Sequence, residues 1–285
     1  MPSVDVIIQA RMGSTRFPGK VLKKIDGSYM FELMVKRIKL SKKIGNIILA
    51  TTTNNNDDYL ATLGKELNLK VYRGSNQNVL SRFIEAINLS DANTFIRITA
   101  DCPIIDPYLI DELIENYFIN DLDYLSNFDP PSFPDGLDLE IFDKKCLIKA
   151  GEVASSKYDR EHVTVWIREK SNFKVGNFKW KEDLSNHRWT VDEPADLEVI
   201  KNIYKHFDKK VDFRWLDVLD LSKKKPELFK ANRHIKRNEG SRMSNGQKLW
   251  GRAKKIIPGG NMLLSKRPEM FLPEKWPSYF SKAKG

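Results

Sequence analysis

The sequence predicts an α/β fold in which a mostly parallel sheet carries helices on both faces. Two observations support this prediction. Short apolar runs rich in β-branched residues alternate with longer amphipathic segments through the first two-thirds of the chain, and polar loops separate them. Such β-α-β alternation is typical of parallel sheets, because parallel strands are joined by crossover connections that usually contain a helix.

The elements follow in order along this part of the chain. Val4 to Ala10 is an apolar run that predicts a buried strand, and apolar residues at helical spacing between Met30 and Leu40 predict the first helix. Pro107 suits a helix start, where its missing N–H costs nothing, and Asp106 before it is expected to cap that helix. Further strands are expected at 46–51, 70–72 and 94–99, and further helices at 57–67, 78–89 and 107–118. The predicted architecture is thus three-layered and Rossmann-like.

The later part of the chain is less regular. It predicts strands at 137–142 and 173–178 and helices at 144–153, 159–169 and 196–207. Residues 232–246 are basic and polar, with glycine and serine, which is typical of a linker. A helix at 247–257 then stops at Pro258-Gly259-Gly260. The predicted domains are therefore residues 1–231, a linker at 232–246 and a further segment at 247–285.

Composition limits the class of protein. Hydrophobic residues make up 41% and charged residues 30%, the balance of a soluble globular protein. The apolar runs are far shorter than the roughly 20 residues that a bilayer demands, so no membrane partner is expected. No secretory signal is visible, and Cys102 and Cys146 lack metal-ligand spacing, which together favour reduced thiols in a cytoplasmic protein. The net charge is +10, but aromatic residues do not interleave with the basic stretches, so a small anionic partner is expected rather than nucleic acid.

Ligands of open parallel sheets bind at the carboxyl ends of the strands. The site is therefore expected in the loops after residues 10, 51, 73 and 99. The first of these loops combines glycines, hydroxyl groups and cations: Arg11, Gly13, Ser14, Thr15, Arg16, Gly19 and Lys20. Glycine lets backbone approach a ligand closely, and exposed N–H groups with nearby cations suit a triphosphate. A solvated basic turn is the alternative, and we favour phosphate binding.

The segment from Ala10 to Lys20 resembles the signature of the cytidylyltransferases related to CMP-KDO synthetase, in particular the branch of spore coat polysaccharide biosynthesis protein F. Further matches lie, in uninterrupted order, at 50–52, 71–75, 98–106, 135–140, 160–164 and 188–192, so the resemblance covers about residues 3–207. It implies a nucleotidyltransferase fold and the transfer of CMP from CTP to an acceptor, with release of pyrophosphate and help from Mg²⁺. The implied acceptor is a small anion, a sugar acid or a related surface-glycan precursor.

The same resemblance implies roles for individual residues. The catalytic set would be Arg11, Arg16 and Lys20, with Lys20 stabilising charge on the α-phosphate. Asp101 and Asp192 would hold Mg²⁺, which prefers a few carboxylates together with phosphate oxygens and water. Nucleotide contacts would come from Gln9, Ala10, Arg11, Gly13, Ser14, Thr15, Thr51, Arg73, Ser75 and Arg82. Acceptor contacts would come from Asp135, Asp138, Glu140, Arg160, Glu161 and His162.

Several alternatives stay open. Arg73 can equally be a solvated residue at a strand end, and Glu161 and His162 can serve in capping or packing. The acceptor can be a sugar phosphate or another phosphate ester, such as an amino-alcohol phosphate, which would give a CDP-linked product. A non-catalytic nucleotide-binding protein is a third possibility, although the presence of Lys20, Asp101 and Asp192 counts against it. A homodimer is expected from the resemblance alone.

The end of the chain shows a second resemblance. Residues 249–260, followed by 277–285, resemble the start of class III PLP-dependent aminotransferases of the glutamate-1-semialdehyde type. In that family the PLP-binding lysine lies far downstream of such a segment. We therefore expect a truncated bifunctional fusion, in which 247–285 does not transaminate and PLP belongs only to the missing aminotransferase part.

Overall fold

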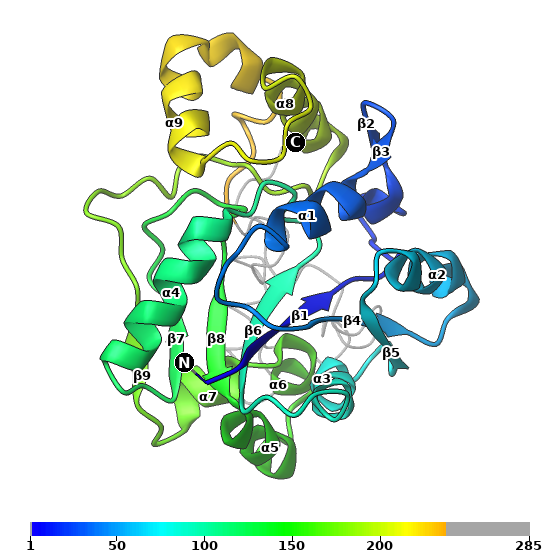
Figure 1. Ribbon diagram of the computed structural model, residues 1–285, viewed down its shortest axis with the longest axis vertical. Coiled ribbons are helices and arrows are strands. Elements are labelled where there is room, and N and C mark those ends of the chain that lie inside the picture. The colour runs from blue at the N-terminus through cyan, green and yellow to red at the C-terminus, as the bar shows by residue number, and fades with distance from the viewer. Residues whose placement is uncertain (1, 238–285) are drawn as a thin grey trace, which may run out of the picture. The chain divides into compact units, whose positions relative to one another are not determined.

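The computed structural model describes residues 2–237, and a seven-stranded sheet with the order β5-β4-β1-β6-β8-β7-β9 forms their centre (Figure 1). Four neighbouring strands run parallel: β1 (Val4–Gln9), β4 (Ile47–Thr52), β5 (Lys70–Gly74) and β6 (Thr94–Thr99). In their register, Val6 lies opposite Ile47 on one side and Ile96 on the other. The strand β8 (Glu140–Asp143) is antiparallel to β6 and to β7 (Tyr124–Ser126), and β9 (Val175–Asn177) is parallel to β7.

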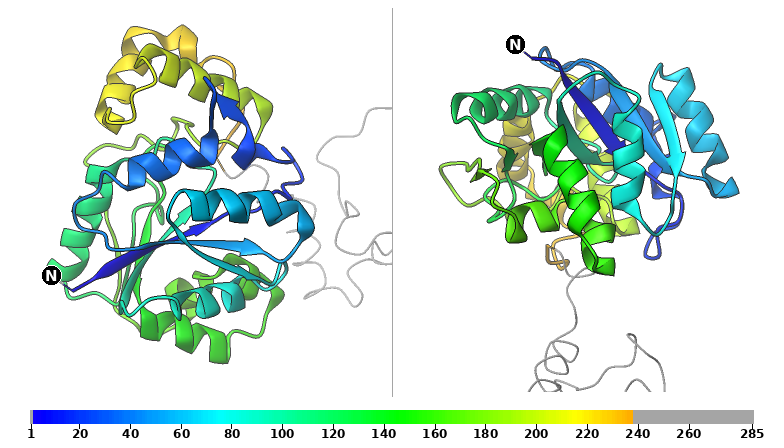
Figure 2. Two further views of the ribbon diagram at one scale, coloured as in Figure 1. Left: turned by 45° about the vertical axis from the view of Figure 1, so that its right-hand side comes forward. Right: turned by 90° about the horizontal axis from the view of Figure 1, so that it is seen from below.

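Helices cover both faces of this sheet (Figure 2). One face packs against α1 (Met30–Ile38), α2 (Asp58–Glu66), α4 (Pro107–Ile119), α8 (Pro194–His206) and α9 (Trp215–Lys224). The other packs against α3 (Val79–Ile87), α5 (Lys144–Val153), α6 (Lys157–His162) and α7 (Val165–Lys170). Along β1, Val6 and Ile8 join the first buried cluster and Ile7 the second, as the two-residue period of a strand requires. The predicted three-layer α/β fold is confirmed.

Some predicted elements differ from the structure. The helix predicted at 159–169 is wrong, because two helices, α6 and α7, meet at Val163. Val163 has φ of 61°, and the N–H of Thr164 donates to the carbonyl of His162 at 2.7 Å, which closes a γ-turn and breaks the helix. The sequence patterns also missed α9 and the small hairpin of β2 (Lys24–Ile25) and β3 (Ser28–Tyr29). Three short 3₁₀ helices complete the elements of residues 2–237: η1 (Lys20–Leu22), η2 (Asn55–Asp57) and η3 (Pro226–Phe229).

The cap predicted for α4 is present. The Asp106 carboxylate accepts hydrogen bonds from the backbone N–H groups of Tyr108 and Leu109, at 2.8 and 3.1 Å. Its second oxygen accepts from the backbone N–H of Trp215 at 2.6 Å, so the same buried side chain also fixes the start of α9. A cap that the sequence predicts locally thus also holds a distant helix in place.

The first compact unit of the chain continues to Arg237, beyond the predicted domain end at residue 231. Asn232 is buried, and its side-chain amide donates to the carbonyl of Arg188 at 3.0 Å and to the Asp196 carboxylate at 2.9 Å. The residues that directly follow 231 therefore belong to the fold. Most of the predicted linker 232–246 and the predicted aminotransferase-like segment 247–285 lie outside the described residues.

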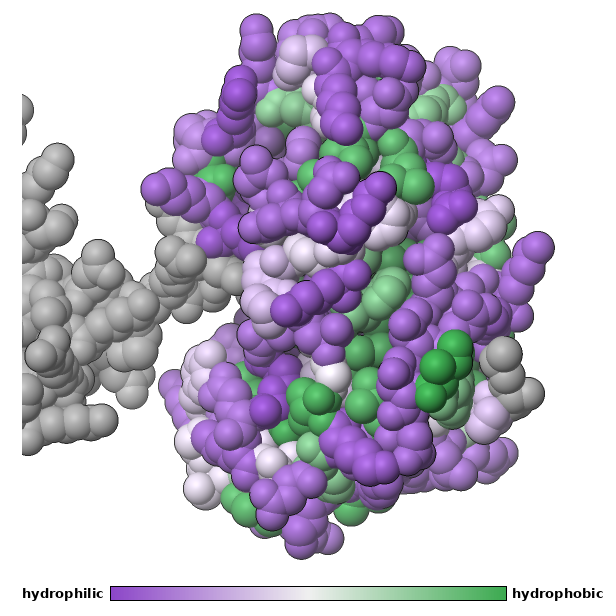
Figure 3. All heavy atoms as spheres, turned by 90° about the vertical axis from the view of Figure 1, so that its left-hand side faces the viewer, coloured by the Kyte–Doolittle hydropathy of each residue, from purple (hydrophilic) through white to green (hydrophobic). Residues whose placement is uncertain are grey.

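The surface is mainly polar on the face that Figure 3 shows, where hydrophobic residues appear in smaller groups between hydrophilic ones. Within residues 2–237, no helix is both long enough and apolar enough to cross a membrane. Cys102 and Cys146 are free and buried.

Candidate active site

Lys20 joins the carboxyl ends of strands that lie far apart in the sequence. It follows the loop after β1 and begins η1, and its side chain is only 11% exposed. The ammonium Nζ donates to Asp101 Oδ2 at 3.1 Å, to Asp192 Oδ1 at 2.9 Å and to the carbonyl of Val191 at 2.8 Å. Asp101 directly follows the end of β6, and the N–H of Val191 donates to its carbonyl at 2.8 Å. Lys20, predicted for catalysis, therefore meets Asp101 and Asp192, the pair predicted for metal binding, at one point.

The charges at this point stabilise one another. Burial alone would lower the pKa of Lys20, but the adjacent Asp101 and Asp192 carboxylates raise it above its usual value. Burial alone would likewise raise the pKa of Asp101, and the Lys20 charge with hydrogen bonds from Thr99 and Lys20 lowers it instead. Both groups are therefore ionised at neutral pH, as partners of opposite charge require.

The predicted phosphate loop surrounds this cluster. Arg16 Nη2 lies 3.0 Å from Asp192 Oδ2, so a second cation of the loop also contacts the carboxylates. Gly19 has φ of 69°, in the left-handed region that favours glycine, and its N–H donates to the carbonyl of Met12 at 3.0 Å. The Met12 N–H donates to Asp57 Oδ1 at 2.7 Å, and Asp57 also accepts from Thr52 at the end of β4. Asp57, which the sequence suggested only as a helix start, thus anchors the loop to a neighbouring strand.

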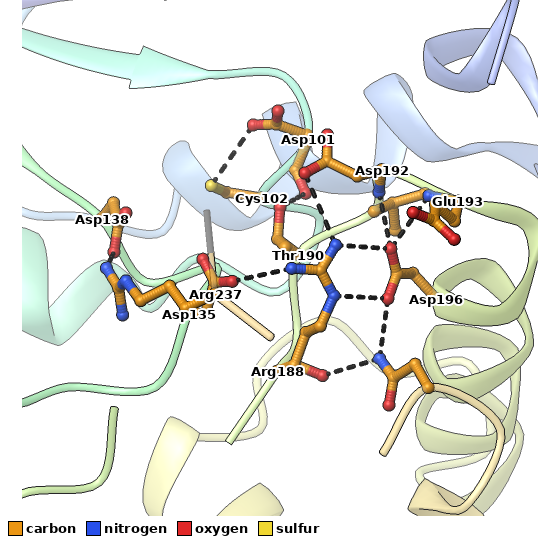
Figure 4. A network of polar contacts seen from close by, with 12 residues as sticks. Asp101, Cys102, Asp135, Asp138, Arg188, Thr190, Asp192, Glu193, Asp196 and Arg237 are labelled. Atoms are coloured by element: carbon orange, nitrogen blue, oxygen red, sulfur yellow. Dashed lines mark hydrogen bonds and ion pairs between the residues drawn. The ribbon is translucent and has the colours of Figure 1, made fainter. Parts of the chain in front are cut away.

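A buried ion-pair network holds Asp192 in place (Figure 4). Arg188 Nε and Nη2 donate to the two carboxylate oxygens of Asp196 at 2.8 and 2.9 Å, and Arg188 Nη1 donates to Asp135 Oδ2 at 3.0 Å. Asp196 is fully buried and also accepts from the backbone N–H groups of Asp192 and Glu193, both at 2.9 Å. The turn that carries Asp192 is therefore fixed by charge-assisted hydrogen bonds.

Two of the predicted nucleotide-binding residues carry buried polar atoms without a partner among the described residues. These atoms are Thr51 Oγ1 and Arg82 Nε and Nη2, while Arg82 Nη1 donates to the carbonyl of Ser75 at 2.9 Å. Burial lowers the pKa of Arg82 to about 10, and repulsion from the Arg11 charge acts in the same direction. Because buried polar groups are normally hydrogen-bonded, these atoms suit a polar ligand.

Other predicted nucleotide-binding residues make contacts within the protein. Arg73 donates to the carbonyls of Thr52 and Asn54, both at 2.9 Å, and so ties β5 to the loop after β4. Arg11 Nη1 donates to the side chain of Asn76 at 2.7 Å. Further such contacts join Ser14 Oγ to Phe17 N, Ser75 Oγ to Asn78 N, and Gln9 Oε1 to Arg97. Ala10, directly after β1, is buried, whereas Gly13 and Thr15 in the loop that follows are exposed.

Asp135 and Asp138, predicted for acceptor binding, lie near Asp101 and Asp192 (Figure 4). Burial and repulsion from Asp138 raise the pKa of Asp135 to about 7, and burial also raises the pKa of Asp138. Arg237 Nη2 donates to Asp138 Oδ1 at 2.6 Å, and Arg237 Nη1 donates to the carbonyl of Phe133 at 3.2 Å. Gly136 between the two carboxylates has φ of 106°, and a Cβ there would lie 2.5 Å from the backbone nitrogen of Thr190. Only glycine allows this close approach.

The remaining predicted acceptor residues lie in other surroundings. Glu140 is buried and pairs with Arg97, and it accepts a hydrogen bond from the Tyr124 hydroxyl at 2.9 Å. Arg160 on α6 donates to the carbonyl of Ala154 at 3.0 Å, at the end of α5. The ring of His162 lies 4.4 Å from that of Tyr158, and Glu161 is exposed. The contact of His162 is thus one of packing, the alternative that the sequence left open for it, and Arg160 binds the carbonyl at the end of α5.

Comparison with known proteins assigns the family. Residues 6–232 match the family model described as cytidylyltransferase. The chain belongs to the cytidylyltransferase family. The predicted enzyme class, a nucleotidyltransferase that uses CTP, is confirmed with it.

Relatives of this cytidylyltransferase match it over nearly their whole length. It is 37% identical over 234 residues to protein MJ1063 of Methanocaldococcus jannaschii. That alignment covers 81% of this chain and 94% of MJ1063. It is 31% identical over 235 residues to the spore coat polysaccharide biosynthesis protein SpsF of Bacillus subtilis, with coverage of 80% and 97%. Among solved structures, a cytidylyltransferase from Leptospira borgpetersenii serovar Hardjo-bovis aligns with a TM-score of 0.77 at 31% identity and covers 80% of this chain and 97% of its own.

The pair of carboxylates in this cytidylyltransferase has the chemistry that Mg²⁺ requires. Asp101 and Asp192 contact the same ammonium group, so their oxygens face a common point. Between residues 2 and 237, no group of three or more His, Cys, Asp or Glu side chains could hold a metal ion. Mg²⁺ is commonly bound by one or two carboxylates together with substrate phosphates, so the pair fits a metal that arrives with a nucleotide.

Proposed function

We propose that this cytidylyltransferase transfers CMP from CTP to a small anionic acceptor, a sugar acid or related precursor of a surface glycan, and releases pyrophosphate in an Mg²⁺-dependent reaction. One observation carries the proposal. Lys20 meets Asp101 and Asp192 at the carboxyl ends of the parallel strands, beside the loop that supplies Arg16. This is the edge of the sheet at which such folds bind ligands.

The loop residues of this chain account for nucleotide binding. The loop from Gly13 to Gly19, together with Arg11, Arg16 and Lys20, would hold the triphosphate. Thr51 and Arg82 offer free polar atoms for the nucleoside. Lys20 would stabilise negative charge that builds on the α-phosphate as the acceptor oxygen attacks, and a pre-oriented cation in a site of low water content stabilises such charge strongly.

Asp101 and Asp192 would hold the metal ion in this proposal. A bound Mg²⁺ supplies Lewis-acid stabilisation to phosphate oxygens. The network of Arg188 and Asp196 orients Asp192 for that role, while the hydrogen bond between the backbones of Asp101 and Val191 keeps the loop after β6 beside the segment that carries Asp192. The protein thereby contributes position and charge, which dominate catalysis of phosphoryl-type transfers.

The acceptor would lie over the loop that carries Asp135 and Asp138. Carboxylates there can accept hydrogen bonds from sugar hydroxyl groups, and Arg237 can pair with the negative group of the acceptor. The relation to a spore coat polysaccharide biosynthesis protein supports a role in surface glycans. Arg237 suits a phosphate as well as a carboxylate, so a phosphate ester that yields a CDP-linked product is the second candidate.

Replacement of Arg237 by alanine tests this assignment of the acceptor site. A charge-assisted hydrogen bond contributes about 1.5–3 kcal/mol, so we expect KM for the acceptor to rise by about 10–100-fold while KM for CTP changes little. Arg237→Lys should recover part of the affinity. The exposed Arg233 is a matched control, and Arg233→Ala should leave both values unchanged. An equal rise in the KM of both substrates would contradict this role.

Pyrophosphate release with each of the four nucleoside triphosphates, with and without Mg²⁺, tests the proposal as a whole. The acceptor panel contains sugar acids, sugar phosphates and amino-alcohol phosphates, and mass spectrometry identifies the product. We expect CTP-dependent release that EDTA abolishes and a product that retains one phosphate. A product with two phosphates would favour the second candidate, and absence of CTP binding would refute both.

Two further expectations belong to the proposal. A homodimer is expected from the family resemblance, and multi-angle light scattering of the full chain measures its mass. A cytoplasmic location follows from the supply of CTP and from the two free, buried cysteines. The resemblance of 247–285 to the start of an aminotransferase stays a prediction.

A further inference from the structure

We infer that Lys20 and Arg16 keep the Asp101–Asp192 pair closed to divalent cations until a triphosphate draws these two cations away. Metal binding would then depend on nucleotide binding, through side chains of this chain. The inference rests on the proposed function, because it takes the two carboxylates as the metal pair.

The contacts of Lys20 occupy the position at which a shared metal ion would sit. An ammonium group has three N–H donors, and those of Lys20 are taken up by Asp101, Asp192 and the carbonyl of Val191, at 3.1, 2.9 and 2.8 Å. The ammonium contacts a carboxylate oxygen of each aspartate and its side chain is only 11% exposed, so it is buried against both members of the pair. A metal ion that bridges both carboxylates has to displace it.

The second oxygen of Asp192 is also engaged. Arg16 Nη2 lies 3.0 Å and Arg188 Nη2 3.5 Å from Asp192 Oδ2. Arg188 is committed to the buried network, whereas the Arg16 side chain is 38% exposed and lies on the loop. Two carboxylates thus face the two cations Lys20 and Arg16, and a divalent ion that enters this balanced arrangement adds unpaired positive charge to a poorly solvated site.

A triphosphate changes this balance. Its negative charges compete for Lys20 and Arg16, both of which extend from the loop that is predicted to bind it. As these side chains turn to phosphate oxygens, both carboxylates lose their partners and become free for the cation that the nucleotide brings. Since linkage between two ligands is reciprocal, metal and nucleotide should each raise the affinity of the other by the same factor.

The experiment measures binding of Mn²⁺ alone, without nucleotide, to the full chain, by the electron paramagnetic resonance signal of free Mn²⁺. Lys20→Met should bind Mn²⁺ at least about tenfold more tightly than the parent protein, since removal of the ammonium opens the pair. The double variant with Lys20→Met and Asp101→Asn should lose this gain. Lys36→Met removes a cation that pairs with Glu32 on the surface of α1, and it should bind Mn²⁺ as the parent does.

Two results would overturn the inference: Lys20→Met that binds Mn²⁺ no more tightly than the parent, or a gain that persists in the double variant. Should Lys20→Met fail to fold, as its circular dichroism would reveal, Arg16→Met provides the same test with a smaller gain at a more exposed side chain. The measurement needs neither CTP nor turnover. If the protein releases no pyrophosphate but Lys20→Met still binds Mn²⁺ more tightly, the transfer reaction is refuted, whereas the inference that Lys20 blocks the Asp101–Asp192 pair stands.

Discussion

Replacement of Lys20 by alanine should lower kcat/KM for CTP by about a thousandfold, with the largest part of the loss in kcat. Removal of one group that stabilises transition-state charge in a shielded site costs about 10²–10³ in rate, and in the proposed function Lys20 would also help to hold the triphosphate. The buried position of its ammonium, with hydrogen bonds to Asp101 and Asp192, places it where no other described lysine lies. Steady-state pyrophosphate release with the acceptor found in the panel measures the effect.

Two companion variants make this test specific. Lys20→Arg keeps the charge but replaces a compact ammonium by a planar guanidinium, so it should restore little activity. Lys36→Ala removes an exposed cation from α1 and should leave kcat/KM unchanged. A loss of less than about tenfold in Lys20→Ala would show that the residue only balances the carboxylates and does not act in the transition state.

Replacement of Asp196 by alanine should lower the free energy of unfolding by about 3–5 kcal/mol, the typical cost of breaking a buried ion pair from one side. The change would leave the buried guanidinium of Arg188 without its main partner and would remove the acceptor for the backbone N–H of Asp192 and for the amide of Asn232. Urea denaturation followed by circular dichroism measures this change.

An exposed ion pair provides the control for that experiment. Asp220 pairs with Lys224 on the surface of α9, and Asp220→Ala should change stability by less than about 0.5 kcal/mol. Asp196→Asn keeps one acceptor oxygen and should fall between the two. If Asp196→Ala unfolds at the same urea concentration as Asp220→Ala, the network around Arg188 does not stabilise the fold.

The strands and helices that the sequence predicted well are those whose signal is local. Three parallel strands stand out as apolar runs because both of their faces are buried, and α4 is marked at its start by Pro107 and its Asp106 cap. The missed break between α6 and α7 lies at Val163, a β-branched residue in the left-handed region, which no pattern of apolar spacing reveals. The hairpin of β2 and β3 escaped notice because its strands are too short to show alternation.

The residues of the site also differ in whether a local sequence signal marks them. Lys20, Asp101 and Asp192 stood in motifs that the sequence displays, and the structure brings them together. The residues that support them were missed, because their partners are distant in the chain: the carboxylate of Asp57 accepts from Met12, and Arg237 reaches Asp138. Residue type and spacing identify what contacts a ligand more readily than what holds those residues in place.

Asn232 and Arg237, which follow the last helix of the described residues, bear on where such a protein can be divided without loss of function. Asn232 donates a hydrogen bond to Asp196, which fixes the turn of Asp192, and Arg237 donates one to Asp138. A recombination breakpoint just after α9 and η3 would leave every strand and helix of the described residues intact, yet the transplanted piece would lack the hydrogen bonds that Asn232 gives to Asp196 and Arg237 to Asp138. A recombined gene that keeps this site intact therefore has to include residues 232–237, so the unit that must be exchanged extends beyond the last described helix.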